Sequence, residues 1–228
     1  MGKTCEIQNY FDRAPAPGVL DYRCGHRTYA GHDGVDIRAP SLAIQRAGVM
    51  VLAAADGRVE RMRDGVADAN VRQTGVAAVK GKECGNGMMI SHGGGWETQY
   101  CHMEAGRFRV HPGQEVKAGE PLGEMGLSGD TEFPHLHITV RHDGQAVDPF
   151  AYGAAPGACG GGRNLWRADL QPSLAYRRGE VLNVGFAQGA VTSDMVDQNG
   201  ANQPPPNADT RLWPSRRPSA WRPATSPS

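Results

Sequence analysis

Alternating polarity marks the clearest element of the chain, a strand over 135–141. Its first six members, in order, are His135, Leu136, His137, Ile138, Thr139 and Val140. Successive side chains of a strand point to opposite faces of a sheet, so the apolar residues belong on the core side. His135 and His137 then point together to the other side, where a pair of imidazoles is a common feature of metal sites.

A second strand is predicted over 96–103, joined to the apolar residues 88–91 by a glycine turn at 93–95. The same period of two places Trp96, Thr98, Tyr100 and His102 on one face and Glu97, Gln99, Cys101 and Met103 on the other. Further short strands are expected over 49–53, 57–62, 112–120, 122–125 and 145–147. The predicted fold class is therefore mainly β and mostly antiparallel, with few or short helices.

Changes in composition divide the chain into five parts. We expect an irregular N-terminal segment at 1–30, the strand-rich domain at 31–152, a Gly-rich linker at 153–162, a small accessory β unit at 163–202 and a tail at 203–228. The tail is rich in Pro, Ser and Arg and has too few apolar residues to order itself, so we expect it to be disordered.

Charge and hydropathy exclude some functions. Among the 228 residues, Lys+Arg 24 balance Asp+Glu 24 to give a formal net charge of zero, and no run of basic residues indicates a nucleic-acid partner. The chain has no uninterrupted apolar stretch of about 18 residues, so we expect no membrane span. The first residues lack the apolar stretch of a signal peptide. Either the protein is cytosolic or its signal peptide is absent from this chain.

The cysteines favour the second of these alternatives. Sequence order suggests pairs Cys5–Cys24 and Cys84–Cys101, which leaves Cys159 over. Five buried thiols are the alternative. Disulfides would place the protein in an oxidising compartment, so we expect it in the bacterial periplasm or cell envelope, or secreted. No Cys-x-x-Cys pair is present, which argues against a structural zinc knuckle.

Two separated segments could together hold a metal. His32 and Asp36 lie four residues apart, and His137 belongs to the histidine-bearing strand. Each pattern is weak alone. A surface histidine and a turn aspartate would explain the spacing of His32 and Asp36, and two histidines on a strand do not by themselves establish a metal site. Together they supply the three nitrogen and oxygen ligands of a catalytic zinc site, which keeps a fourth position open. No His-Glu-x-x-His motif is present, so a helix-borne zinc protease site is excluded.

Over residues 25–152 the chain resembles the lysostaphin/LytM-like zinc endopeptidases. The resemblance rests on Gly-His-Asp-Gly-Val-Asp-Ile-Arg-Ala-Pro at 31–40, on 87–103, on Val-Lys-Ala-Gly at 116–119 and on Pro-His-Leu-His at 134–137. It implies a mostly antiparallel sheet whose groove cuts cross-links or stem peptides of peptidoglycan. It also implies one zinc ion held by His32, Asp36 and His137.

The resemblance assigns further roles by motif position. His102 and His135 would form the catalytic pair that positions water and stabilises the transition state, and Tyr100 would line the groove. A Cys84–Cys101 disulfide would brace the catalytic strand without entering the site. His26, His92, His111 and His142 have no place in the motif, although His92 could support the site from outside.

Three functions remain open on these residues. The first is a peptidoglycan endopeptidase, for which peptidoglycan or its peptides are the partner. The second is a catalytically idle module that binds the cell wall or regulates another protein, and the five motif residues argue against it. The third is a zinc peptidase with a different peptide substrate, because the motif encodes the reaction and not the groove. The sequence identifies no partner protein.

Overall fold

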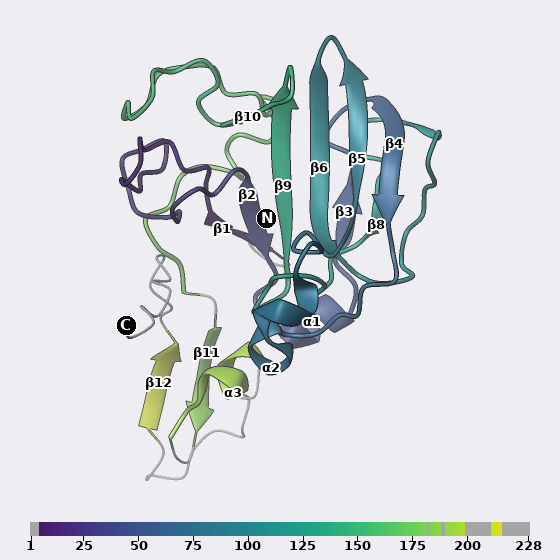
Figure 1. The fold of residues 1–228 in the computed structure, drawn as a ribbon. Coiled ribbons are helices and arrows are strands. Elements are labelled where there is room, and N and C mark those ends of the chain that lie inside the picture. Colours follow the sequence, from purple (N-terminus) through teal and green to yellow (C-terminus); the bar gives the residue numbers. More distant parts are fainter. Residues whose placement is uncertain (1–4, 182, 188–189, 199–210, 216–228) are drawn as a thin grey trace.

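An antiparallel sheet of eight strands forms the main body of the computed structural model (Figure 1). The structure describes residues 5–181, 183–187, 190–198 and 211–215. The strands lie in the order β1-β2-β9-β6-β5-β4-β7, and β10 pairs with β9. Their bounds are β1 Glu6–Asn9, β2 Val35–Arg38, β4 Gly57–Arg63, β5 Asn86–Gly93, β6 Trp96–Met103, β7 Glu115–Val116, β9 His135–His142 and β10 Gln145–Val147. The predicted mainly antiparallel β fold is confirmed.

Smaller elements surround this sheet. β3 (Met50–Leu52) pairs with β8 (Pro121–Glu124), and β11 (Asn183–Ala187) pairs with β12 (Arg211–Ser215). The described helices are α1 Leu42–Arg46, α2 Val71–Thr74, the 3-10 helix η1 Val76–Val79 and α3 Ser193–Asp197, each of four or five residues. Within the described residues, no helix combines the length and the apolar character that a membrane crossing needs.

The hydrophobic core lies against one face of the large sheet. Val35, Ile138, Tyr100 and Met88 are neighbours across four strands, and each side chain is at most 3% exposed. Burying such a side chain stabilises the fold by about 1.5–3 kcal/mol. Because side chains alternate, this row fixes the register and leaves the residues on either side of each member pointing to the opposite face.

The N-terminal segment, expected to be irregular, contributes a strand. β1 pairs with β2 at the edge of the sheet, with Ile7 opposite Ile37. Beyond it, the rings of Tyr10 and Tyr22 lie 5.0 to 5.6 Å from each other and from the rings of Phe150 and Tyr176, in stacked and edge-on contacts. This aromatic cluster packs the beginning of the chain against the segment that follows the last strand of the sheet.

The segments joined by the aromatic cluster also carry one of the two disulfides. Cys24 is bonded to Cys159, so the predicted Cys5–Cys24 pair is wrong, whereas the predicted Cys84–Cys101 pair is confirmed. Sequence order misled here because packing brings the N-terminal segment beside residues that are 135 positions away. The segment 153–162, expected to be a linker, is therefore covalently attached to the body of the protein.

The C-terminal expectations are only partly covered by the described residues. β11 lies in the expected accessory unit at 163–202, but its partner β12 lies within 203–228, where a disordered tail was expected. That expectation is wrong for Arg211–Ser215, and the rest of 203–228 lies outside the described residues. Pro214 lies within this strand, and proline is uncommon in strands, so the sequence does not indicate it.

The Cys24–Cys159 bond should stabilise the fold substantially, because it closes a long loop of the unfolded chain. Replacing both cysteines with serine (C24S/C159S) should lower the free energy of unfolding by about 2–4 kcal/mol. Urea unfolding without reductant measures the change. With reductant the wild type loses the same bond, and the difference should vanish. A persisting difference would mean that serine disturbs the packing instead.

Candidate metal centre

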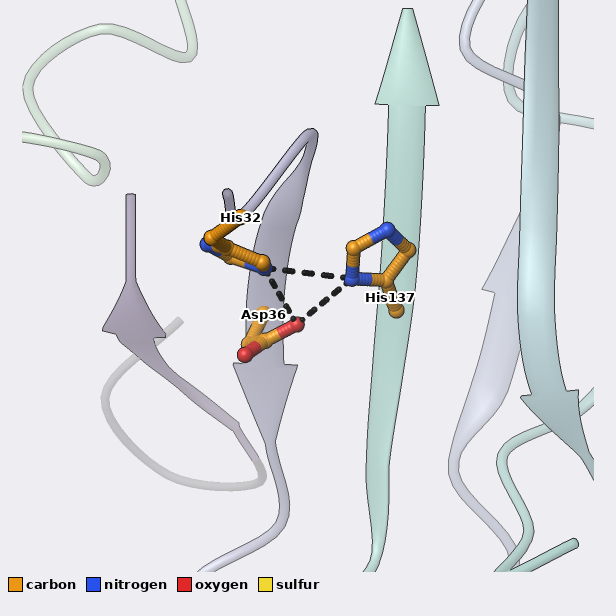
Figure 2. A group of neighbouring side chains, drawn as sticks. All are labelled: His32, Asp36 and His137. Carbon is orange, nitrogen blue, oxygen red and sulfur yellow. Dashed lines mark hydrogen bonds and ion pairs between the residues drawn. The ribbon is translucent and has the colours of Figure 1, made fainter. Parts of the chain in front are cut away.

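Three side chains converge on one point over the paired strands β2 and β9. His32 Nε2 lies 3.1 Å from Asp36 Oδ1 and 3.2 Å from His137 Nδ1, and the last two atoms are 2.9 Å apart (Figure 2). Asp36 on β2 is directly opposite His137 on β9, and His32 precedes β2. The structure thus brings together the three residues that the sequence suggested as ligands.

A glycine allows this convergence. Gly34 lies in the turn between His32 and β2, and a Cβ added there would be 2.6 Å from His137 Nε2 and 2.6 Å from the carbonyl oxygen of Ile138. Both distances are far below ordinary contact. The turn can therefore pass this close to β9 only with glycine, and this places His32 above Asp36.

Hydrogen bonds outside the cluster orient its members. His32 Nδ1 donates to the carbonyl oxygen of Tyr10 at 2.7 Å, which leaves the lone pair on Nε2. Asn9 Nδ2 donates to Asp36 Oδ2 at 2.8 Å. His137 Nε2 lies 3.0 Å from Thr139 Oγ1, so Nδ1 faces the cluster. Sequence reasoning missed Asn9 and Tyr10, because only the pairing of β1 with β2 brings them here.

The cluster fits a zinc ion. Bonds of about 2.0–2.1 Å at tetrahedral angles place neighbouring ligand atoms about 3.3 Å apart. The three separations, 2.9 to 3.2 Å, are close to that value. Two imidazole nitrogens and one carboxylate oxygen are a donor set that suits zinc. His32 and Asp36 are each 2% exposed, and His137 is the member that solvent reaches most easily.

His102 and His135 lie beside the cluster. Their ring centroids are 4.5 Å apart, the His102 ring is 6.2 Å from that of His137, and His135 Nε2 is 3.6 Å from Asp36 Oδ1. All five histidine and aspartate residues of the motif therefore gather in one place.

The strand position of His102 differs from the prediction. We expected His102 on the same face as Tyr100, but Tyr100 and Met103 both lie in the core. The strand holds a β-bulge here: Met103 pairs with Asn86 and Tyr100 with Met88, and His102 has a φ of 61°. The extra residue turns His102 to the metal side. Simple alternation cannot reveal a bulge, so the predicted face was wrong.

Tyr100 does not line a groove in this structure. Its side chain is fully buried in the core, and its hydroxyl accepts a hydrogen bond from the backbone N–H of Ala54 at 2.8 Å. Thr98 Oγ1 lies between this hydroxyl and His92 Nε2, at 3.2 and 2.8 Å. His92 therefore supports the buried hydroxyl of Tyr100.

Backbone carbonyls select the tautomers of His102 and His135. His102 Nδ1 donates to the carbonyl oxygen of Ser128 at 2.8 Å, and His135 Nδ1 to that of Phe133 at 3.0 Å. Each ring then offers an unshared electron pair at Nε2. Burial lowers the pKa of His135, and lowers that of His102 well below its ordinary value, so both rings are neutral near pH 7.

His137 behaves differently in the metal-free protein. Burial lowers the pKa of its imidazole, but hydrogen bonds to Asp33 and Asp36 outweigh burial and raise the pKa to about 9. Asp36 remains ionised, because its histidine neighbours hold its carboxyl pKa well below the usual range despite complete burial. Without metal, a proton on His137 thus compensates the buried carboxylate.

Comparisons with known proteins show the family of this chain. A protein-family model described as "Peptidase family M23" matches residues 30–149, more than half of the 228 residues. The DD-carboxypeptidase/endopeptidase Mpg of Neisseria meningitidis serogroup B is 35% identical over 124 residues, which cover 54% of this chain and 23% of that protein. The murein hydrolase activator NlpD of Escherichia coli is 30% identical over 122 residues, or 54% of this chain and 26% of that protein.

The chain thus spans about a quarter of the length of these two relatives. Among solved structures, it is similar to the catalytic domain of the prophage-encoded M23 protein EnpA from Enterococcus faecalis, with 24% identity and a TM-score of 0.43. That likeness covers 65% of this chain and 92% of the other. The catalytic domain of lysostaphin from Staphylococcus simulans is 21% identical with a TM-score of 0.40, over 63% and 88% of the two chains.

The protonated state of His137 can be tested in the metal-free protein. The pKa is raised in the folded state, so its stabilising effect is fully present below the unfolded value of about 6.5 and is lost as the pH rises through about 9. Replacing Asp33 with asparagine should lower this pKa and weaken the loss of stability between these pH values. NMR titration of the His137 ring and urea unfolding at several pH values measure both effects.

A matched control removes an exposed carboxylate elsewhere. Asp169 pairs with Arg167 at the surface, and Asp169→Asn should leave the His137 titration unchanged. An unshifted titration in Asp33→Asn would show that Asp33 does not hold the proton on His137.

Proposed function

The chain belongs to peptidase family M23, and on this basis we propose that it is a zinc-dependent endopeptidase that hydrolyses peptide bonds of bacterial peptidoglycan. The observation that supports this best is the joint presence of a three-ligand cluster and two neutral histidines beside it. His32, Asp36 and His137 would hold the metal. When bound, zinc supplies a Lewis acid that acidifies water and polarises a peptide carbonyl.

The two neutral histidines would move and hold protons. His102 has its Nε2 electron pair free to accept a proton from the attacking water, and the Ser128 carbonyl at Nδ1 stabilises the imidazolium that forms. The same Nε2–H can then donate to the nitrogen of the leaving amine. His135, in the same tautomer, presents its Nε2 electron pair and can orient the water by accepting a hydrogen bond from it.

A regulatory role is the second candidate, favoured by the similarity to a protein named as a murein hydrolase activator. Such a role needs no turnover, whereas this chain retains all five motif residues and gathers them in one place. Peptidase activity therefore explains more of the site. The third candidate, a zinc peptidase for another peptide, predicts cleavage of free peptides with sacculi left intact.

We place the protein in the bacterial cell envelope or among secreted proteins. Two disulfides support this location, because such bonds persist in oxidising compartments. Peptidoglycan is accessible there, and partner proteins are outside this proposal.

Metal binding and turnover should separate in two variants. His137→Ala should lose zinc and activity together, because it removes a ligand. His102→Ala should keep about one zinc per chain and lose about 10²- to 10⁴-fold in turnover, which is the usual contribution of a general base. Zinc analysis and the release of new amino termini from purified sacculi measure the two properties.

His111→Ala serves as the control, since His111 is exposed and its ring contacts the carbonyl oxygen of the neighbouring Pro112. It should match the wild type in both assays. Full activity in His102→Ala would contradict the assigned role. Wild-type protein that carries zinc but leaves sacculi intact would favour the regulatory role or another substrate.

Zinc should displace the proton from His137. The ring is protonated at pH 7 in the metal-free protein, and a ligand nitrogen must be unprotonated, so binding should release about one proton per zinc from this ring. Calorimetric titration in buffers of different ionisation enthalpy counts the released protons. Apparent affinity should increase with pH up to about 9. In Asp33→Asn, fewer protons should be released at pH 7.

A further inference from the structure

The metal-side face of the large sheet continues well beyond the cluster. Pairing places Asp36, His137 and Cys101 side by side on β2, β9 and β6. The next row on this face runs Thr139, Gln99, Met89 and Arg61, from β9 to β4. Figure 1 shows β9, β6, β5 and β4 next to one another in this order. A peptide that crosses the strands from the cluster would therefore reach Arg61.

A cavity lies at the far end of this face. It has a volume of about 230 Å³, and its lining includes Arg61, Arg63, Cys84, Met89 and Gln99. Gly87 also lines it, and a Cβ there would collide with the carbonyl oxygen of Tyr100. Only glycine therefore fits where β5 passes this carbonyl, and the cavity is lined by both Cys84 and the arginines of β4.

The two arginines of the cavity have no carboxylate partner in contact. Arg61 Nη2 contacts Met89 Sδ at 3.0 Å, and Arg63 donates to the carbonyl oxygens of Gly85 and Gly81, at 2.6 and 3.4 Å. Neither forms an ion pair with a described residue. Arg61 is exposed and Arg63 is half-buried. The carboxyl pKa of Glu83 is lowered by a backbone hydrogen bond from Gly81 and also by the charge of Arg63, so Arg61 is the less compensated of the two arginines.

Two other positively charged residues of this face lie opposite an acidic residue in the strand pairing. Arg58 on β4 lies directly opposite Glu115 on β7, and Glu97 on β6 lies opposite Arg141 on β9. Arg61 and Arg63 differ in this respect, because the residues opposite them on β5 are the uncharged Met89 and Gly87. A guanidinium group presents paired N–H donors that match a carboxylate.

Building on the proposed function, we propose that the cavity at Arg61 and Arg63 is a subsite for a carboxylate of the substrate peptide. The subsite selects carboxylate-bearing stem peptides over glycine bridges, which have no side-chain carboxylate. Three strand spacings separate β9 from β4, about 14 Å in all. An extended peptide covers this distance in about four residues, so the recognised carboxylate lies about four residues from the cleaved bond.

Binding of two matched peptides tests the subsite. One is a pentapeptide stem from diaminopimelate-type peptidoglycan, and the other is the same peptide with its carboxylates amidated. Calorimetry with the zinc-loaded His102→Ala variant should show about tenfold weaker binding of the amidated peptide. The preference should shrink at high salt, because the cavity is partly open to solvent. Equal affinity for the two peptides would overturn the proposal.

Charge variants assign the preference to the cavity. Arg61→Gln should weaken binding of the free peptide about five- to tenfold and leave the amidated peptide unchanged, whereas Arg61→Lys should keep most of the preference. Arg46→Gln removes the same charge from the exposed surface of α1 and should keep the preference intact. The effect of Arg63→Gln on binding is harder to interpret, because Arg63 also donates hydrogen bonds to the 81–85 loop.

Two results would overturn the assignment: equal weakening of both peptides in Arg61→Gln, or the same loss in Arg46→Gln. The measurement needs no cleavage, so it is separable from the proposed function. Selective binding without turnover would support the subsite and contradict the peptidase. Cleavage of sacculi without selectivity would support the peptidase and contradict the subsite.

Discussion

The pairing register of β2, β9 and β6 is the constraint on which the site depends. On one face the row Val35, Ile138 and Tyr100 is buried in the core, and on the other face the next row carries Asp36, His137 and Cys101. A slip of one residue would expose the apolar row and bury two metal-site groups in its place. Hydrophobic burial therefore holds the ligands opposite each other, whether or not a metal is bound.

Much of this arrangement could be predicted from the sequence, because alternation is a local property. The polarity pattern at 135–141 correctly assigned Leu136 and Ile138 to the core and His137 to the opposite face. The four matched segments correctly identified the family, as the match over residues 30–149 confirms. The spacing of His32 and Asp36 was uninformative alone, since only the turn at Gly34 brings them to β9.

The errors share a physical cause, which is that packing between distant segments leaves no local pattern. Nothing near Cys24 indicates Cys159, because the aromatic cluster that joins their segments forms only in the fold. The bulge at His102 also leaves no pattern in the sequence, since one extra residue changes the face on which a side chain lies without changing composition. Asn9 and the Tyr10 carbonyl support the ligands from a segment that looked irregular.

The β-bulge places His102 on the metal side of the sheet, which regular pairing could not do. Regular alternation would leave His102 on the core face beside Tyr100, where a polar ring would need buried partners. With φ at 61°, the backbone N–H of His102 instead donates to the Cys84 carbonyl, and its ring donates to the Ser128 carbonyl. The loop that carries Cys84 is bonded to β6 through Cys101, on the same face as the cluster. The disulfide therefore braces the strand where it leaves regular pairing, and the strained residue it supports is the proposed general base.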